Sequence, residues 1–373
     1  MSHEAWLLSD KSPYHLIPTS LPNVYSFVPP PKGTDLTTAS KSTLMKHGLL
    51  MRKPDQEREP ERFARWLRFA RDIWTEEKFV PPTFGHPESV THNLKGSRRP
   101  KKDVPVTYGD CYNNSWGGIA VVGAWVGAMG TWSVPTVTQP DNPPSPATPA
   151  ANGGGWQSAS WVGLDGGAGI IEGTNSTDVL QAGVSQNLDS TGQPAYYAWY
   201  EWSVLLDGLT AMDPQYPYVF PIPITSMKVD AGDTITVVVQ YVKHMGDDIA
   251  DPIPPAGPYS FGGILLTNET SGEAVNLYLL PPPGGSFIGD SAEWIMECPT
   301  CYLGGTFPQF STVHFDDAGA CNVGDAPPGS DIGVELQKAT RCFLVNKNGS
   351  LGNLVYGDLG TVDIVYQDYD PNP

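Results

Sequence analysis

The chain has 373 residues, a formal net charge of −18 at pH 7, and 40% hydrophobic residues together with 40 Gly and 37 Pro. This apolar content is too high for a disordered chain, and the many turn formers disfavour a helical one, so we expect an all-β fold. Nucleic acid is disfavoured as a partner, because a polyanion would be repelled by so acidic a protein.

Charge divides the chain near residue 105. Residues 1–105 contain 17 Lys and Arg against 12 Asp and Glu, whereas residues 106–373 contain 5 against 28. The two parts carry about +5 and −23, and they should attract one another at neutral pH. We therefore divide the sequence into a basic N-terminal part, 1–105, and an acidic domain, 106–373.

The N-terminal part is predicted to contain one amphipathic basic helix between Pro60 and Phe79. At helical spacing this segment carries apolar residues with arginines between them: Phe63, Trp66, Leu67, Ala70, Ile73 and Trp74, with Arg62, Arg65, Arg68 and Arg71. The apolar face needs a partner, and the acidic domain is the nearest one. An anionic membrane surface is an alternative that the acidic remainder of the chain disfavours.

A basic run, Arg-Arg-Pro-Lys-Lys-Asp at residues 98–103, precedes the first strand of the acidic domain. Such a run suits either a junction at which a prosegment is removed or a solvated charged linker. In both cases the domain boundary is expected between residues 99 and 110.

Three short segments in the acidic domain, residues 161–167, 178–184 and 196–202, are β-prone and bounded by turn residues. Because side chains alternate along a strand, Trp161 shares a face with Asp165. A further segment, residues 292–297, places Glu293 and Glu297 on one face in the same way. These segments would present aromatic side chains with a few carboxylates and one amide. The alternative is a set of ordinary sandwich strands with aromatic cores.

The remaining strands are predicted to follow in hairpin style. Residues 224–242 alternate around a turn at 230–233, residues 261–280 fold back at 270–272, and residues 354–369 give two closing strands. Short, evenly spaced strands with Gly, Asp and Asn turns indicate an antiparallel β-sandwich of jelly-roll type.

Cysteine and histidine usage limits the chemistry. Cys298 and Cys301 have the spacing of half a zinc site, but no second pair follows, so no metal is expected; one or two disulfides in an oxidising compartment fit the five cysteines better. After residue 105 the histidines are His244 and His314, far from the motif strands, and there is no Gly-x-Ser-x-Gly or His-Glu-x-x-His motif. Carboxylates, amides and aromatics remain, a set that suits acid–base hydrolysis or carbohydrate recognition.

Five motifs in order resemble those of the glutamic peptidases, also called eqolisins or family G1. They are Asn-Ser-Trp-Gly-Gly at 114–118, Trp-Val-Gly-Leu-Asp-Gly at 161–166, Leu-Gln-Ala-Gly-Val at 180–184, Trp-Tyr-Glu-Trp at 199–202 and Ala-Glu-Trp-Ile-Met-Glu at 292–297. No single motif is decisive, but the order and the span of about residues 112–373 make the resemblance specific. It implies two packed antiparallel sheets, of concanavalin-like jelly-roll type, with a substrate cleft.

The resemblance also implies the site residues. Gln181 matches the catalytic glutamine and Glu297 the catalytic glutamate, and Trp116, Trp161, Asp165, Trp199 and Glu201 match positions near them. A carboxylate can take a proton from the attacking water, and a neutral amide can donate to the oxyanion that develops. Glu293 shares a strand face with Glu297 and is the rival for the base, and a structural carboxylate is the alternative interpretation of Glu297.

We therefore predict an acid-acting endopeptidase that acts on proteins or peptides, is made with an inhibitory N-terminal prosegment, needs no cofactor and is a monomer. The family is mostly secreted, although the first ten residues lack the basic and apolar regions of a signal peptide and no run is long enough to span a bilayer. The competing hypotheses are a carbohydrate-binding sandwich and a glycosidase using two of Glu201, Glu293 and Glu297.

Two departures from the family pattern bear on substrate preference. A Gly-rich loop, residues 166–177, separates Asp165 from Gln181, and Ser-Val-Leu-Leu at 203–206 replaces the usual Tyr-Pro. Neither removes a proposed catalytic group.

Overall fold

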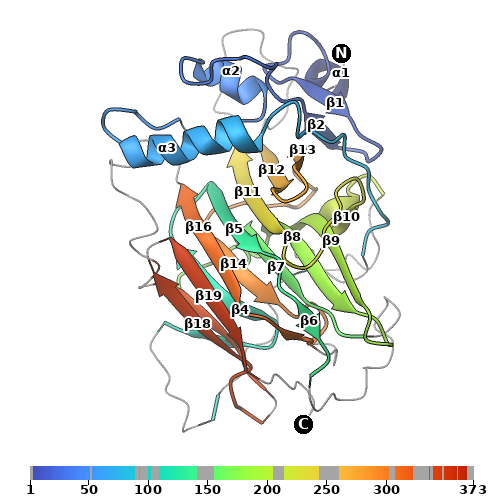
Figure 1. Cartoon of the computed structure of the whole chain (residues 1–373), viewed down its shortest axis with the longest axis vertical. Helices are drawn as coiled ribbons and strands as arrows, with labels where there is room; N and C mark the ends of the chain where they lie inside the picture. The colour runs from blue at the N-terminus through green and yellow to red at the C-terminus, as the bar shows by residue number, and fades with distance from the viewer. Residues whose placement is uncertain are drawn as a thin grey trace.

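The structure is a computed structural model of the whole chain in which most residues are described. The described residues are 3–50, 53–88, 92, 100–101, 109–140, 155–204, 214–242, 260–301, 307–321, 336, 339–346, 348–358 and 360–367. Two large antiparallel sheets dominate the fold, which confirms the predicted all-β sandwich (Figure 1).

One sheet has nine strands. In spatial order they are β1 (Leu16–Pro18), β2 (Val24–Phe27), β13 (Glu273–Leu279), β12 (Phe261–Asn268), β11 (Thr234–Val242), β5 (Gly127–Ser133), β16 (Val313–Cys321), β19 (Thr361–Tyr366) and β18 (Asn353–Asp358). The hairpin predicted at 270–272 joins β12 to β13, and β18 and β19 are the two predicted closing strands.

The second sheet has eight strands and holds all five sequence motifs. In spatial order they are β10 (Ile222–Ile224), β9 (Pro194–Ser203), β8 (Val179–Leu188), β7 (Ala159–Leu164), β14 (Ser291–Glu297), β4 (Trp116–Val122), β17 (Thr340–Leu344) and β3 (Cys111–Asn113). β17 and β3 run parallel, and the other pairs in this sheet are antiparallel. A small third sheet pairs β15 (Gln309–Phe310) with β6 (Val137–Thr138).

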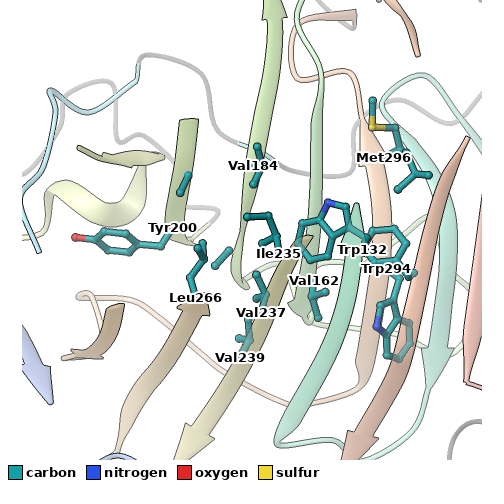
Figure 2. Packing of buried hydrophobic residues seen from close by; sticks show 14 of the residues in the cluster. Trp132, Val162, Val184, Tyr200, Ile235, Val237, Val239, Leu266, Trp294 and Met296 are labelled. Atoms are coloured by element: carbon teal, nitrogen blue, oxygen red, sulfur yellow. The ribbon is translucent and has the colours of Figure 1, made fainter. Parts of the chain in front are cut away.

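The hydrophobic core lies between the two large sheets, where every second residue of a strand points inward (Figure 2). Val162 of β7 and Val184 of β8 pack there with Val237 of β11, and each is fully buried or nearly so. Burial of one such side chain contributes about 1.5–3 kcal/mol. Two tryptophans also join the sheets by hydrogen bonds: Trp132 Nε1 donates to Ser160 Oγ at 2.9 Å, and Trp294 Nε1 donates to the Met129 carbonyl at 2.7 Å.

The N-terminal part forms more structure than the one predicted helix. It contains α1 (His3–Leu7), α2 (Lys41–Lys46), α3 (Pro60–Arg68), a π-helical turn η1 (Phe69–Ile73), and the strands β1 and β2. α3 begins at a proline, whose missing N–H costs nothing in a first turn. The predicted apolar face of this segment is confirmed: Phe63, Trp66 and Trp74 are buried in a cluster with Val238 of β11 and Leu265 of β12.

The opposite charges of the two parts led us to expect ion pairs between the arginines of this helix and carboxylates near the motifs, and the placement of α3 corrects that expectation. α3 packs against the nine-stranded sheet, whereas the motifs lie on the eight-stranded one. Arg68 forms an ion pair with Asp317 of β16, at 2.9 Å between Nη2 and Oδ2, and not with a motif carboxylate. The side chains of Arg62 and Arg65 lie outside the described part of the structure.

After the helix, the chain crosses from one sheet to the other. Phe79 bridges to Ala274 of β13, and Phe84 bridges to Ile224 of β10, at the edge of the eight-stranded sheet. The Glu88 N–H donates to the Pro221 carbonyl at 2.9 Å. This crossing segment, residues 79–88, directs the chain toward the face that carries the motifs.

The predicted hairpin over residues 224–242 is wrong. β10 pairs with β9 in the eight-stranded sheet, whereas β11 pairs with β5 and β12 in the nine-stranded sheet. The turn at 230–233 therefore connects two sheets rather than two neighbouring strands. Its Asp and Gly residues marked a turn correctly, but local sequence does not say in which sheet the next strand will pair.

Cys298 and Cys301 are joined by a disulfide, so this pair is not half of a zinc site. Among the described residues no group of His, Cys, Asp and Glu could hold a metal ion. None of the described helices is long and apolar enough to cross a membrane.

Candidate active site

The motif side chains gather on the face of the eight-stranded sheet that points away from the core. Gln181 on β8 and Glu201 on β9 are direct cross-strand partners, so their side chains leave the sheet on the same side. Trp161 of β7 and Trp199 of β9 both stand opposite Gly183 of β8. A side chain at Gly183 would come within 2.2 Å of the Ser160 carbonyl oxygen and 2.5 Å of Trp161 Cβ, so this position requires glycine for β7 to approach β8.

Gln181 and Glu201 are fully buried and hydrogen-bonded to each other. Gln181 Nε2 donates to Glu201 Oε2 at 2.8 Å. Burial raises the pKa of Glu201 well above its ordinary value, and the nearby His92 opposes that rise. Glu201 thereby fixes the direction of the Gln181 amide.

Glu297, at the end of β14, is also fully buried, and its carboxylate is held by an indole. Trp161 Nε1 donates to Glu297 Oε2 at 2.9 Å. Trp116 of β4 packs edge-on against the Trp161 ring, with 4.8 Å between the ring centroids. The other oxygen, Oε1, has no hydrogen-bond partner among the described residues.

His92 of the N-terminal part lies among these groups and is itself fully buried. Its carbonyl accepts from Gln181 Nε2 at 2.5 Å, and its N–H donates to Glu201 Oε2 at 3.0 Å. Its Nδ1 lies 3.3 Å from Glu297 Oε2, and its ring stacks at a tilt on Trp199, with 4.1 Å between centroids. One residue of the chain thus contacts both Gln181 and Glu297.

Sequence reasoning missed His92, as well as Glu88 beside it. Glu88 Oε2 lies 3.9 Å from His92 Nε2, and Tyr197 of β9 donates its hydroxyl to Glu88 Oε1 at 2.8 Å. Neither residue belongs to a periodic pattern. The signal for His92 was its place in the basic part of the chain, which the charge contrast predicts to contact the acidic domain.

Asp165 has different hydrogen-bond partners from those of Gln181 and Glu297. It follows the last residue of β7 with a positive φ of 71°, so strand alternation no longer applies to it. Its carboxylate accepts from the backbone N–H groups of Ile288, Gly289 and Asp290 at 2.7–3.0 Å. These contacts indicate that Asp165 organises the loop before β14.

Glu293 shares the face of β14 with Glu297, as predicted, but it has different surroundings. Both of its oxygens are buried and lack a hydrogen-bond partner among the described residues. Burial raises the pKa of Glu293 well above its ordinary value. Burial therefore favours the protonated form of this carboxyl.

The peptidase A4 family model matches residues 114–359 of the chain. The chain is similar to scytalido-glutamic peptidase solved with a transition-state analogue inhibitor, at 21% identity over 68% of this chain and 98% of that one, with a TM-score of 0.45. It is also similar to SCP-B, an eqolisin solved with the tripeptide Ala-Ile-His (22% identity, 68% and 98% covered, TM-score 0.43). A third similar structure is aspergilloglutamic peptidase from Aspergillus niger (23% identity, 57% and 99% covered, TM-score 0.40). No curated protein matches the sequence.

Proposed function

Since this chain belongs to the peptidase A4 family, the glutamic peptidases or eqolisins, and is a peptide hydrolase, we propose that it is an acid-acting endopeptidase whose catalytic dyad is Gln181 and Glu297. One observation carries the proposal. The amide of Gln181 donates to a backbone carbonyl of the chain itself, that of His92, and the carboxylate of Glu297 contacts the same residue. A substrate carbonyl could take the place of that carbonyl.

In the proposed reaction Glu297 is the general base. It takes a proton from a water molecule as the water oxygen attacks the carbonyl carbon of the scissile peptide bond. The same proton then passes to the leaving nitrogen, the C–N bond breaks, and an acid and an amine are released. The indole N–H of Trp161 orients the carboxylate and leaves Oε1 available for the water.

Gln181 stabilises the oxyanion that develops during the attack. Its Nε2 carries two N–H bonds, one directed at Glu201 and the other at the carbonyl position. An oxyanion donor removed by mutation typically costs about 2.7–4 kcal/mol of transition-state stabilisation. Because an amide does not ionise, the donor persists at acidic pH, which favours an enzyme that works there.

Glu297 is preferred to Glu293 as the base on the basis of their surroundings. Glu297 contacts Trp161 and His92, the residue that also contacts Gln181. Glu293 has no such contact, and burial raises the pKa of its carboxyl so that it holds its proton. A carboxyl that is already protonated cannot accept a proton from water.

We further propose that residues 1–105 are a prosegment, that residues 106–373 are the catalytic domain, and that the enzyme acts after secretion. Support for the first comes from the contrast in charge and from the position of His92 in the site. Support for the last comes from the Cys298–Cys301 disulfide, a bond typical of oxidising compartments. Of the predicted processing region, 99–110, the residues 99 and 102–108 lie outside the described part of the structure.

Purified full-length protein, brought to about pH 4, should digest denatured protein and an internally quenched peptide. Gln181→Glu and Glu297→Gln, each checked for folding by thermal unfolding, should each lose most of this activity, about 10²–10³-fold for the oxyanion donor. Glu293→Gln is the matched control and should remain active.

Three results would change the assignment. Near-normal proteolysis by folded Glu297→Gln with loss in Glu293→Gln would move the base to Glu293. Normal activity in folded Gln181→Glu would remove glutamine from the dyad. Digestion of polysaccharides in place of proteins at pH 3–5 would favour the glycosidase hypothesis.

A further inference from the structure

His92 is bound in the site as a peptide would be, but its side chain occupies a place that catalysis needs. Its carbonyl and N–H are both used, by Gln181 at 2.5 Å and by Glu201 at 3.0 Å. Its imidazole Nδ1 lies 3.3 Å from Glu297 Oε2, on the group that would activate water. A true substrate would leave Glu297 free to hold water instead.

We infer that His92 is the residue that keeps the full chain inactive, by seating its backbone on Gln181 and Glu201 and pairing its imidazolium with Glu297. This inference rests on the proposed function, and it replaces the expected arginine–carboxylate contacts near the site with a single histidine. α3 and its Arg68–Asp317 pair belong to the other sheet.

Carboxyl groups contact His92 from two strands and from its own segment. Glu297 of β14 lies 3.3 Å from ring Nδ1, and Glu88, four residues earlier, has Oε2 at 3.9 Å from ring Nε2, whereas Glu201 of β9 accepts from the backbone N–H of His92. Tyr197 donates to Glu88 and so holds that carboxylate beside the ring. Burial lowers the pKa of His92, but the interactions with Glu297 and Glu88 outweigh burial and raise that pKa to about 10. The ring is therefore charged at neutral pH.

The sign of the pH effect follows from these groups. At alkaline pH the imidazolium of His92 loses its proton. Because its pKa is raised from 6.5 to about 10, its contribution to the stability of the closed state is complete below pH 6.5 and is lost as the pH rises through about 10. The closed state should therefore be stable at neutral pH and open as the pH rises through about 10.

The test uses the full-length chain and compares His92→Ala and His92→Gln with wild type and with His86→Ala. His86 is an exposed histidine of the same segment and serves as the matched control. Initial rates on a quenched peptide are read at pH 5 while gels show the chain still uncut. Intact His92→Ala and His92→Gln should cleave about 10- to 100-fold faster than intact wild type, because charge-assisted contacts are lost, and His86→Ala should match wild type.

A second readout does not depend on activity. The imidazole resonance of His92 can be followed in an NMR titration of the intact wild-type chain and identified by its absence from His92→Gln. It should keep the chemical shift of a charged imidazolium up to about pH 9. Equal rates for intact wild type and His92→Ala, with the acid-processed enzyme active, would overturn the inference and leave the proposed function standing. No cleavage by any variant, with the His92 resonance still charged at pH 9, would overturn the peptidase assignment itself.

Discussion

The network of Gln181, Glu201 and His92 depends on one side chain that cannot change its charge. Gln181 Nε2 donates to both of the other residues, and a carboxyl at this position would place a third ionisable group beside Glu201 and Glu297. The neutral amide can therefore stabilise an oxyanion where an ionised group would repel it. At the scale of single residues, this is the physical reason to expect glutamine rather than glutamate on β8.

Trp161→Phe should lower activity while the fold is retained. The substitution keeps the ring against Trp116 but removes the hydrogen bond from the indole N–H to Glu297 Oε2, and hydrogen bonds to charged groups are worth about 1.5–3 kcal/mol. We expect kcat/KM of the acid-activated enzyme to fall about 10-fold or more. Trp156→Phe is the control for lost volume, because Trp156 is equally buried and its Nε1 has no partner among the described residues. Equal losses in the two variants would show that the indole N–H is not used.

At the scale of elements, buried aspartates tie together the two loops that flank β14 and β8. Asp165 accepts three backbone N–H groups from residues 288–290, and Asp290 accepts those of Asn175 and Ser176 at 2.5 and 3.0 Å. Asp178 accepts the Ser286 N–H. Burial raises the pKa of Asp165 and of Asp178 to about 6 although the backbone donors oppose the rise. These loops are therefore built to be more stable in acid.

Asp178→Asn should flatten the pH dependence of stability. A carboxyl whose pKa is raised from 3.8 to about 6 contributes stability that is complete below 3.8 and is lost as pH rises through about 6. Melting temperatures between pH 4 and 7, measured in the Glu297→Gln background to prevent self-cleavage, should fall less steeply in the variant. Asp189→Asn is the contrasting control, since hydrogen bonds from Thr191 lower the pKa of that exposed carboxyl. An unchanged slope in Asp178→Asn would contradict the burial argument.

Helix α3 is held by its apolar face rather than by its charge. The Arg68–Asp317 pair is half exposed at the arginine, and exposed pairs contribute about 0–1 kcal/mol. Arg68→Ala should therefore leave both the melting temperature and the pH of self-processing nearly unchanged. Trp66→Ala, in the buried cluster, should cost about 3–5 kcal/mol of unfolding free energy. A large shift of the processing pH in Arg68→Ala would restore the arginine helix as the switch.

The sequence predicted those elements whose signal is local. Alternation identified β7, β8, β9 and β14, and helical spacing identified the buried face of α3. The features it did not predict depend on contacts between distant residues. His92 meets Gln181 across 89 positions, β2 joins β13, and β10 and β11 separate into different sheets. Asp165 was misplaced because a positive φ ended the alternation one residue after β7.

At the scale of the whole molecule, residues 1–105 carry a net charge of about +5 and residues 106–373 about −23. Their attraction should hold the two parts together at neutral pH, in addition to the His92 contacts. Full-length protein should be stable and inactive at pH 7 and should convert itself to a shorter, active form at about pH 4, with a cut near residues 99–110. Mass spectrometry after incubation at both pH values checks this. Glu297→Gln should stay whole. Self-shortening by that variant would show that the cut is made elsewhere, and full activity of the uncut chain at pH 7 would show that the N-terminal part does not inhibit.

Because β2 pairs with β13, cleavage of the chain need not release the N-terminal segment. Residues 24–26 are backbone-paired with residues 277–279, and Tyr14, Phe27 and Trp66 are buried with Phe261 and Tyr278. Of the described N-terminal residues, His92 is the one that contacts both Gln181 and Glu297 and must leave for substrate to enter. The excised segment would then remain as a small companion subunit, shielding β13 from pairing with the open edge of another molecule. The working enzyme would be an assembly of two chains made from one gene product.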